Sequence, residues 1–206
     1  MITKVQGRTA SREMTVKASP RLSALEKAML KWAVIDPEDR VLDASVGAGL
    51  VAEYLRRNMQ CEVCGVSDRM EDVRQARERL QTCDIVYALP GDIPWRENAF
   101  DVVLLKLGAD EPEANRRMLS EVYRVLKQGG QLLLGLSCYP AAVSALAGMM
   151  AEESVEMRRP LRSQRVKTML DALRFEHVSW QRTGFGNGVM IAWKPKPGLE
   201  ALCKEA

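Results

Sequence analysis

The stretch Val41-Leu-Asp-Ala-Ser-Val-Gly-Ala-Gly49 decides the fold. Its apolar run ends at the carboxylate of Asp43 and passes into a turn of small residues, after which helical periodicity begins at Leu50. Gly47 and Gly49 allow a ligand to approach the backbone closely, and a helix that follows the turn offers free N–H groups. The stretch therefore predicts a strand, a ligand-binding turn and a helix, in that order.

The same alternation continues on the C-terminal side of this stretch. Short apolar runs predict strands over 40–44, 61–66, 84–88, 100–105 and 131–136. Helical periodicity predicts helices over 21–34, 50–58, 70–80 and 112–126, with Gly129-Gly130 interpreted as the stop of the last one. Strands that alternate with helices are typical of a parallel sheet covered on both faces. The sequence thus predicts an α/β fold with three layers, α/β/α.

The last third of the chain departs from this rhythm. Two successive helices are expected over 139–153 and 160–173, and two strands over 176–182 and 189–193. A glycine-rich connection over 184–188, with Asn-Gly near its end, joins these strands and indicates an antiparallel hairpin. The expected sheet is therefore mostly parallel with an antiparallel last strand.

Length and composition limit the class of protein. The chain has 206 residues, of which 47% are hydrophobic and 28% charged, which favours one globular domain. Five scattered cysteines indicate reduced thiols, no apolar run is long enough for a bilayer span, and no secretory signal is expected, so we expect a cytoplasmic protein without a membrane partner. The net charge of +3 is too small to indicate nucleic-acid binding.

Four motifs occur in order along the chain: the glycine-rich stretch 41–49, the loop Gly91-Asp-Ile93, the strand 100–105 and the helix and turn over 119–131. Together they make the chain similar to the class I S-adenosylmethionine (SAM)-dependent methyltransferases, and in particular to their small type-11-like group. The resemblance covers residues 38–137 and implies a Rossmann-like sheet. We expect an N-terminal arm and helix over 1–35, a SAM-binding methyltransferase-like domain over 36–196 and a C-terminal tail over 197–206.

The resemblance also implies a cofactor site and a reaction. Asp43 would hold the methionine amino group, Asp92 would accept a hydrogen bond from the adenine amine, and Ile93 would pack on the ring. The backbone at Ser45, Gly47 and Gly49 would run along the methionine and ribose, and Lys106 and Leu107 would face the region of methyl transfer. The implied activity is transfer of a methyl group from SAM to an unidentified acceptor, and no catalytic base is evident.

Two departures from the family pattern concern the cofactor site. The family's first motif glycine is Ser45 here, and Ser adopts positive φ less readily. The acidic residue that usually ends the second strand and binds the ribose is replaced by Ser67, with Asp68 one residue later. Asp68 can substitute only if the strand has already ended, because successive strand side chains point to opposite faces. These departures keep open an alternative, a non-catalytic methyltransferase-fold binding module with a weakened cofactor site.

Other features favour ordinary explanations over functional ones. Cys61 and Cys64 fall on a predicted strand without a second pair of ligands, and His177 is the only histidine, so no metal site is expected. A basic run over 158–167 would suit an anionic substrate such as RNA, but solvated helix faces explain most such runs, so a small-molecule acceptor is favoured over nucleic acid. Met149-Met150 would fill the core or line a substrate pocket.

Overall fold

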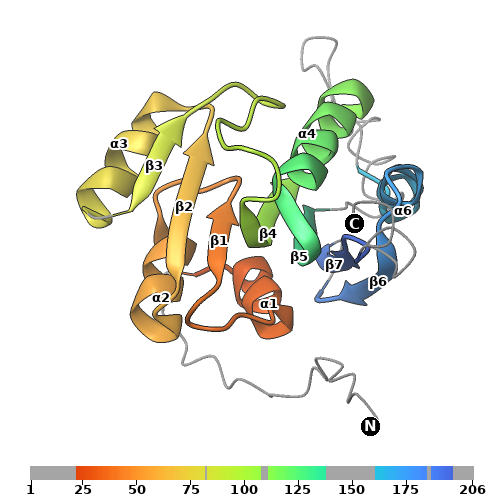
Figure 1. The fold of residues 1–206 in the computed structure, drawn as a ribbon, viewed down its shortest axis with the longest axis horizontal. Helices are drawn as coiled ribbons and strands as arrows, with labels where there is room; N and C mark the ends of the chain where they lie inside the picture. Colours follow the sequence, from red (N-terminus) through yellow and green to blue (C-terminus); the bar gives the residue numbers. More distant parts are fainter. Residues whose placement is uncertain (1–21, 82, 108–110, 138–160, 185–186, 197–206) are drawn as a thin grey trace, which may run out of the picture.

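The fold was analysed in a computed structural model, which describes residues 22–81, 83–107, 111–137, 161–184 and 187–196. These residues form a seven-stranded sheet in the order β3-β2-β1-β4-β5-β7-β6 (Figure 1). The strands are β1 Arg40–Asp43, β2 Glu62–Ser67, β3 Asp84–Tyr87, β4 Phe100–Leu107, β5 Leu126–Ser137, β6 Glu176–Arg182 and β7 Asn187–Trp193. The helices are α1 Ala24–Trp32, α2 Leu50–Met59, α3 Met70–Arg79, α4 Pro112–Val125 and α6 Ser163–Ala172.

The strand pairing confirms the predicted fold class. β1 to β5 pair in parallel, while β7 runs antiparallel to both β5 and β6. The hairpin of β6 and β7 is therefore present as predicted, although Asn187 and Gly188 belong to β7 rather than to the connection.

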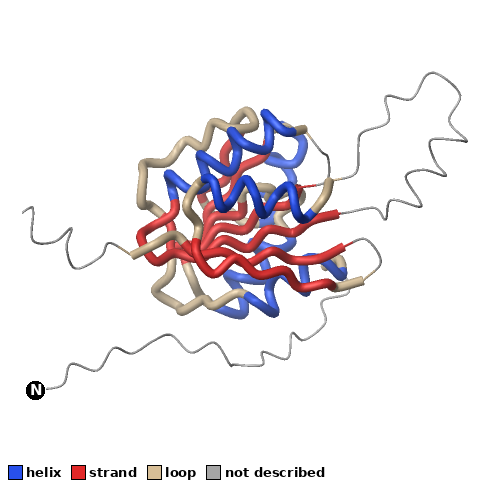
Figure 2. Tube along the Cα trace, turned by 90° about the vertical axis from the view of Figure 1, so that its right-hand side faces the viewer, coloured by secondary structure: helices blue, strands red, loops and turns tan. Residues whose placement is uncertain are grey.

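The sheet lies between two helical layers, as Figure 2 shows from the side. One core cluster combines sheet residues with the apolar faces of α1, α2 and α3, and the other combines them with α4 and α6. Cys64 lies on β2 and Cys61 immediately precedes it, and the two belong to the core clusters on opposite faces of the sheet. Both faces of the sheet are thus buried, which accounts for the nearly continuous apolar sequence of the central strands.

Helix α1 begins later than predicted. It starts at Ala24 rather than at residue 21, because Ser23 provides the N-cap: its Oγ accepts from the Glu26 N–H at 3.2 Å, and its own N–H donates to Glu26 Oε2 at 2.9 Å. This reciprocal capping box satisfies two N–H groups that have no partner within the helix. The sequence also offers a helix start signal at Pro20 after Ser19, and these two residues lie outside the described residues.

The interpretation of Gly129-Gly130 as a helix stop is wrong. Helix α4 ends at Val125, and β5 begins at the next residue, Leu126, well before the predicted start at 131. The glycines lie inside β5, where the register with β4 shifts between the pairs Phe100–Leu126 and Val102–Gln131. Gly129 has φ +75°, a backbone conformation that residues with a side chain rarely adopt, and it lies at this irregularity of the strand.

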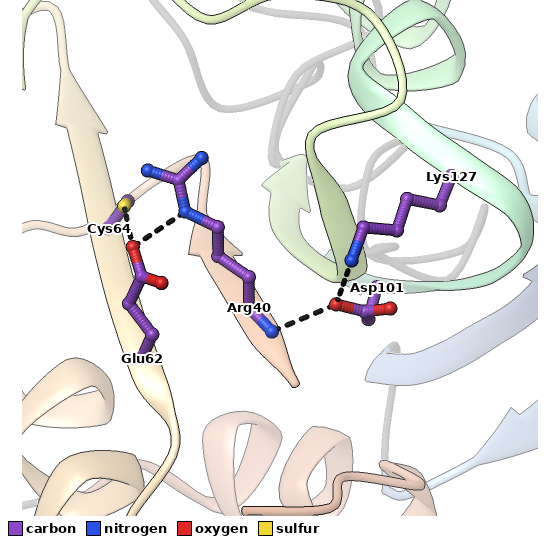
Figure 3. Close-up of polar contacts among 5 residues, drawn as sticks. All are labelled: Arg40, Glu62, Cys64, Asp101 and Lys127. Atoms are coloured by element: carbon purple, nitrogen blue, oxygen red, sulfur yellow. Dashed lines mark hydrogen bonds and ion pairs between the residues drawn. The ribbon is translucent and has the colours of Figure 1, made fainter. Parts of the chain in front are cut away.

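A polar network connects the strands at the amino end of the sheet (Figure 3). Arg40 Nε donates to Glu62 Oε1 at 2.6 Å, and its backbone N–H donates to Asp101 Oδ2 at 3.0 Å. Lys127 Nζ donates to the same oxygen of Asp101 at 2.8 Å. These side chains come from β1, β2, β4 and β5, so the network holds the register of the central strands at the end opposite their carboxyl termini.

The second half of the chain is described in part. Helix α6 confirms the predicted helix over 160–173 with a later start, whereas the predicted helix over 139–153, Met149-Met150 and the tail over 197–206 fall outside the described residues. Among the described helices, none is both long and apolar enough to cross a bilayer.

Candidate functional site

A cavity of about 570 Å³ opens at the carboxyl ends of β1, β2 and β4. The strand order reverses at this point, because the chain runs outward from β1 to β3 on one side and continues through β4 on the other. Open α/β sheets bind ligands at such a switch point, and the volume is typical of a small-molecule site. The lining residues are Ala44, Ser45, Gly47, Val66, Ser67, Asp68, Asp72, Ala88, Leu89, Pro90, Asp92, Ile93, Leu105, Lys106, Leu107, Glu111, Ala114, Asn115 and Met118.

The loop between β1 and α2 forms one wall and is fastened on both sides. The Ala44 N–H donates to the Leu104 carbonyl of β4 at 2.8 Å, and the Val46 N–H donates to the Val66 carbonyl of β2 at 3.1 Å. Ser45 Oγ accepts from the Lys106 N–H at 3.0 Å. Ser45 is not among the described residues with positive φ, so the substitution of the family's glycine causes no strain and adds a hydrogen bond.

The two glycines of this loop serve different purposes. Gly47 has φ +49° and lines the cavity, and a Cβ added to it would meet no atom within 4 Å. The space that a side chain would fill there is open to a ligand. Gly49 has φ +79° and caps α2, and its added Cβ would lie 3.1 Å from Ala76 of α3. Gly49 is therefore required by the turn and by helix packing, and it does not line the cavity.

Acidic side chains gather where β2 ends. The strand ends at Ser67, so Asp68 lies beyond it and lines the cavity, which meets the condition that the sequence set for it. Asp72, in the first turn of α3, also lines the cavity and accepts a hydrogen bond from Ser67 Oγ at 3.3 Å. Sequence reasoning missed Asp72, although its position in the first helical turn after β2 was a usable signal.

The loop after β3 forms the opposite wall. Ile93 is buried and its N–H donates to Glu121 Oε2 at 3.1 Å, while Arg124 donates to the Ile93 carbonyl at 2.8 Å. The hydrogen bond from Arg124 lowers the pKa of Glu121, so this pair on α4 stays ionised. Asp92, by contrast, is exposed at the cavity edge. The helix α4 thus fixes the loop on which Asp92 and Ile93 stand.

Asp43 lies beneath the loop between β1 and α2 and does not line the cavity. Its Oδ1 accepts from the Ser45 N–H at 3.2 Å, whereas Oδ2 is buried without a hydrogen-bond partner. Burial raises the pKa of Asp43 to about 6, against the opposing effect of the Lys106 charge. Asp43 therefore supports the loop directly and acts on the cavity through its charge.

Lys106 lines the cavity and pairs with a carboxylate from α1. Its Nζ donates to Glu26 Oε1 at 2.7 Å. Although burial alone would lower the pKa of Lys106, Asp43 and Glu26 raise it. Glu26 was not predicted, because no local pattern links α1 to the end of β4.

Most of the predicted site residues come together around this cavity. Those that line it are Ser45, Gly47, Ser67, Asp68, Asp92, Ile93 and Lys106, whereas Asp43 and Gly49 stand behind its wall. The alternative, a non-catalytic binding module with a weakened cofactor site, would be favoured by a cleft that is filled with side chains. The cleft in this structure is open, which does not favour that alternative.

The cysteine pair and the histidine lie apart from this site. Burial raises the pKa of both Cys61 and Cys64 to about 11, and the two thiols lie in core clusters on opposite faces of the sheet, so they do not form a paired site. His177 is exposed at an irregularity of β6, with φ +52°. Within the described ranges, no group of three or more His, Cys, Asp and Glu could hold a metal ion.

Comparison with known proteins finds relatives of the central part of the chain. Residues 42–134 match the family described as "Methyltransferase domain". Over 114 residues the chain is 31% identical to the ubiquinone/menaquinone biosynthesis C-methyltransferase UbiE of Cereibacter sphaeroides. This aligned region is 52% of this chain and 46% of the relative. It is also 31% identical over 105 residues to the glycine/sarcosine/dimethylglycine N-methyltransferase of Actinopolyspora halophila, over 48% of this chain and 19% of the relative. The chain thus spans about half or less of these relatives' length.

Solved structures agree on the fold. A SAM-dependent methyltransferase from Methanosarcina mazei superposes with a TM-score of 0.64 at 19% identity, covering 79% of this chain and 95% of the other. At this identity the likeness concerns the arrangement of the sheet and helices.

Proposed function

Because this chain belongs to the family of class I SAM-dependent methyltransferases, we propose that it transfers a methyl group from SAM to a small-molecule acceptor. The observation that carries the proposal is the open cavity at the switch point of the sheet, with the bare backbone of Gly47 in its wall. That open space fits a ligand that must approach the glycine-rich loop closely.

We propose that different residues of the cavity bind different parts of the cofactor. Asp92 accepts from the adenine amine and Ile93 packs on the ring, because both stand on the loop that α4 fixes. Asp68 and Asp72 hold the ribose hydroxyls at the end of β2, with Ser67 orienting Asp72.

The amino-acid end of the cofactor would then lie along the loop between β1 and α2. Ser45 and Gly47 form its wall, Asp43 supports it from beneath, and Lys106 stands at its edge. Gly49 contributes by shaping the turn rather than by contact.

The chemistry requires orientation more than acid–base groups. SAM supplies a methyl group on a positively charged sulfur, and the protein needs to hold an acceptor in line with it. The walls beyond the cofactor loops are formed by Leu107, Glu111, Ala114 and Met118. They favour a partly apolar acceptor of small size.

The charge of the cavity also favours a small acceptor over nucleic acid. Of the residues that the structure describes, four with carboxylate side chains line it, namely Asp68, Asp72, Asp92 and Glu111. These charges attract a cationic cofactor and repel a polyanion, whose binding depends on basic contacts to phosphates. Of the predicted basic run, Arg158 and Arg159 fall outside the described residues, and Lys167 on α6 pairs with Asp171 at 2.9 Å.

Calorimetric titration with S-adenosylhomocysteine tests the cofactor site. We expect the wild type to bind and Asp92→Asn to bind about tenfold more weakly, since one well-placed hydrogen bond to a charged group is worth roughly 1.5 kcal/mol. Asp84→Asn is the matched control, because Asp84 is also exposed and does not line the cavity. Absence of binding to the wild type at millimolar ligand would overturn the proposal.

Transfer of label from methyl-labelled SAM tests the acceptor class. We compare a demethylated quinol and glycine, the kinds of acceptor that the relatives' names indicate, with bulk RNA. Labelling of a small molecule is expected, and labelling of RNA alone would contradict the proposal.

A further inference from the structure

The described part of the cavity lining has one basic side chain among several acidic ones. Of the described residues that line it, Lys106 is basic, whereas Asp68, Asp72, Asp92 and Glu111 are acidic. SAM has the complementary pattern: a positive sulfonium, a positive ammonium and one negative carboxylate. Among the described lining residues, the one cation therefore has one obvious partner in the ligand.

Lys106 is held in a fixed place by a residue from another element. The side chain of Glu26 is 13% exposed and that of Lys106 is 31% exposed, and the two groups meet at 2.7 Å. The second oxygen of Glu26 accepts from the Ser23 N–H in the capping box of α1. Glu26 is thus anchored independently of Lys106 and can determine where the ammonium lies.

The ammonium keeps both its charge and its donors. The charges of Asp43 and Glu26 outweigh burial and raise the pKa of Lys106, so it is cationic at neutral pH. A lysine ammonium has three N–H donors, and the structure assigns one of them to Glu26. Lys106 can therefore donate to a ligand without giving up its partner.

We propose that Lys106 binds the carboxylate at the amino-acid end of SAM, with Glu26 as the residue that positions its ammonium. This inference rests on the proposed function. The location agrees with it, because the Lys106 N–H donates to Ser45 Oγ, and Ser45 belongs to the loop that would run along the amino-acid end. Without Glu26, the carboxylates that still act on Lys106 are Asp43 beneath the loop and Asp72 in the cavity wall, so the ammonium would no longer be held at one place.

The test compares two ligands that differ by one group. These are S-adenosylhomocysteine and its decarboxylated analogue, which keeps the amine and lacks the carboxylate. By calorimetry, the wild type should bind the complete ligand about tenfold more tightly, a typical effect of one charge-assisted pair. In Lys106→Met this preference should disappear. The wild-type comparison stands even if the variant fails to fold.

Lys127→Met is the matched control. Lys127 also stands on a central strand and pairs with a carboxylate, Asp101, at 2.8 Å, but at the opposite end of the sheet. It should keep the tenfold preference. Equal affinity of the wild type for both ligands, or a preference that survives in Lys106→Met, would overturn the inference while leaving the proposed function intact. If the wild type binds neither ligand, the proposed function fails, and this inference with it.

The positioning role of Glu26 is tested by the same ratio of affinities. Glu26→Ala should reduce the preference for the carboxylate severalfold, and Glu26→Gln, which can still accept from Lys106, should restore most of it. Ser23→Ala removes the cap of α1 but leaves the ion pair, so it should lower stability and keep the preference. A loss of preference in Ser23→Ala equal to that in Glu26→Ala would show that Glu26 acts only through the helix.

Discussion

Asp43 carries a buried carboxylate oxygen without a hydrogen-bond partner, and this has a consequence for stability. Burial raises its pKa from 3.8 to about 6, with Lys106 and Glu26 as the charged groups that act on it. Because the folded-state pKa is raised, the stability from this group is complete below pH 3.8 and is lost as pH rises through about 6.

Asp43→Asn should therefore remove a pH-dependent part of the free energy of unfolding. Relative to the variant, the wild type should lose about 2 to 3 kcal/mol between pH 4 and pH 8, given 1.36 kcal/mol per pKa unit. Urea denaturation of both proteins at the two pH values measures this difference. A difference that does not change with pH would contradict the expectation.

At the residue scale, sequence reasoning found groups that belong to motifs and missed those that join the site from elsewhere. Asp92 belongs to the motif Gly91-Asp-Ile93, and Lys106 is the first residue after the strand predicted over 100–105; the resemblance to the family implied a role for both. Glu26 stands 80 positions before Lys106, and nothing local indicates their contact. Lys194 is similar: it is buried and donates to the carbonyls of Tyr123 and Leu126 at the end of α4, a pairing that only the folded chain creates.

At the scale of elements, the packing of β2 against the loop after β1 depends on a glycine. A Cβ on Gly65 would lie 2.7 Å from Ile85 Cδ1 and 2.8 Å from Val46 Cγ2. Val46 is fixed by its N–H bond to Val66, so the loop cannot easily move aside. Gly65→Ala should lower the free energy of unfolding by about 1 to 3 kcal/mol, as overpacking does, and should weaken binding of S-adenosylhomocysteine.

Gly184→Ala is the control for this substitution. Its Cβ would meet no atom within 4 Å, so its stability and ligand affinity should stay close to those of the wild type. Thermal unfolding and calorimetry measure both quantities. Equal effects at the two glycines would mean that the contact with Val46 is not the cause.

Periodicity predicted the existence and order of the elements well, and failed at their ends. The apolar pattern located the central strands because burial on both faces imposes it. It could not place the start of β5, since Gly129-Gly130 has the composition of a turn while the partner strand β4 holds these residues in the sheet. The start of α1 depended in the same way on which serine caps it.

At the scale of the whole molecule, α1 belongs to the same core as the sheet. The predicted division at residue 35 separates it from the domain in sequence, but Leu30 is 1% exposed within the cluster that contains β1, α2 and α3. Leu30→Ala should cost about 2 to 5 kcal/mol of unfolding free energy through the cavity that it leaves. Lys31→Ala, on an exposed position of the same helix, should cost little.

Urea denaturation followed by circular dichroism checks this expectation. One cooperative transition, shifted to lower urea in Leu30→Ala, would show that the helix unfolds together with the sheet. A transition unchanged from the wild type would mean that the helix is a separate appendage.

The hydroxyl of Ser45 connects the loop after β1 to β4, because it accepts a hydrogen bond from the N–H of Lys106. The adjacent residues Ala44 and Val46 donate backbone hydrogen bonds to β4 and β2, so these parts of the cavity wall are held together. The loops that form these walls are already ordered before a ligand binds, so binding needs to order little of the backbone. The conformational entropy that flexible loops lose on binding is here lost during folding instead. A residue that interrupts the glycine pattern can thereby favour tight binding rather than oppose it.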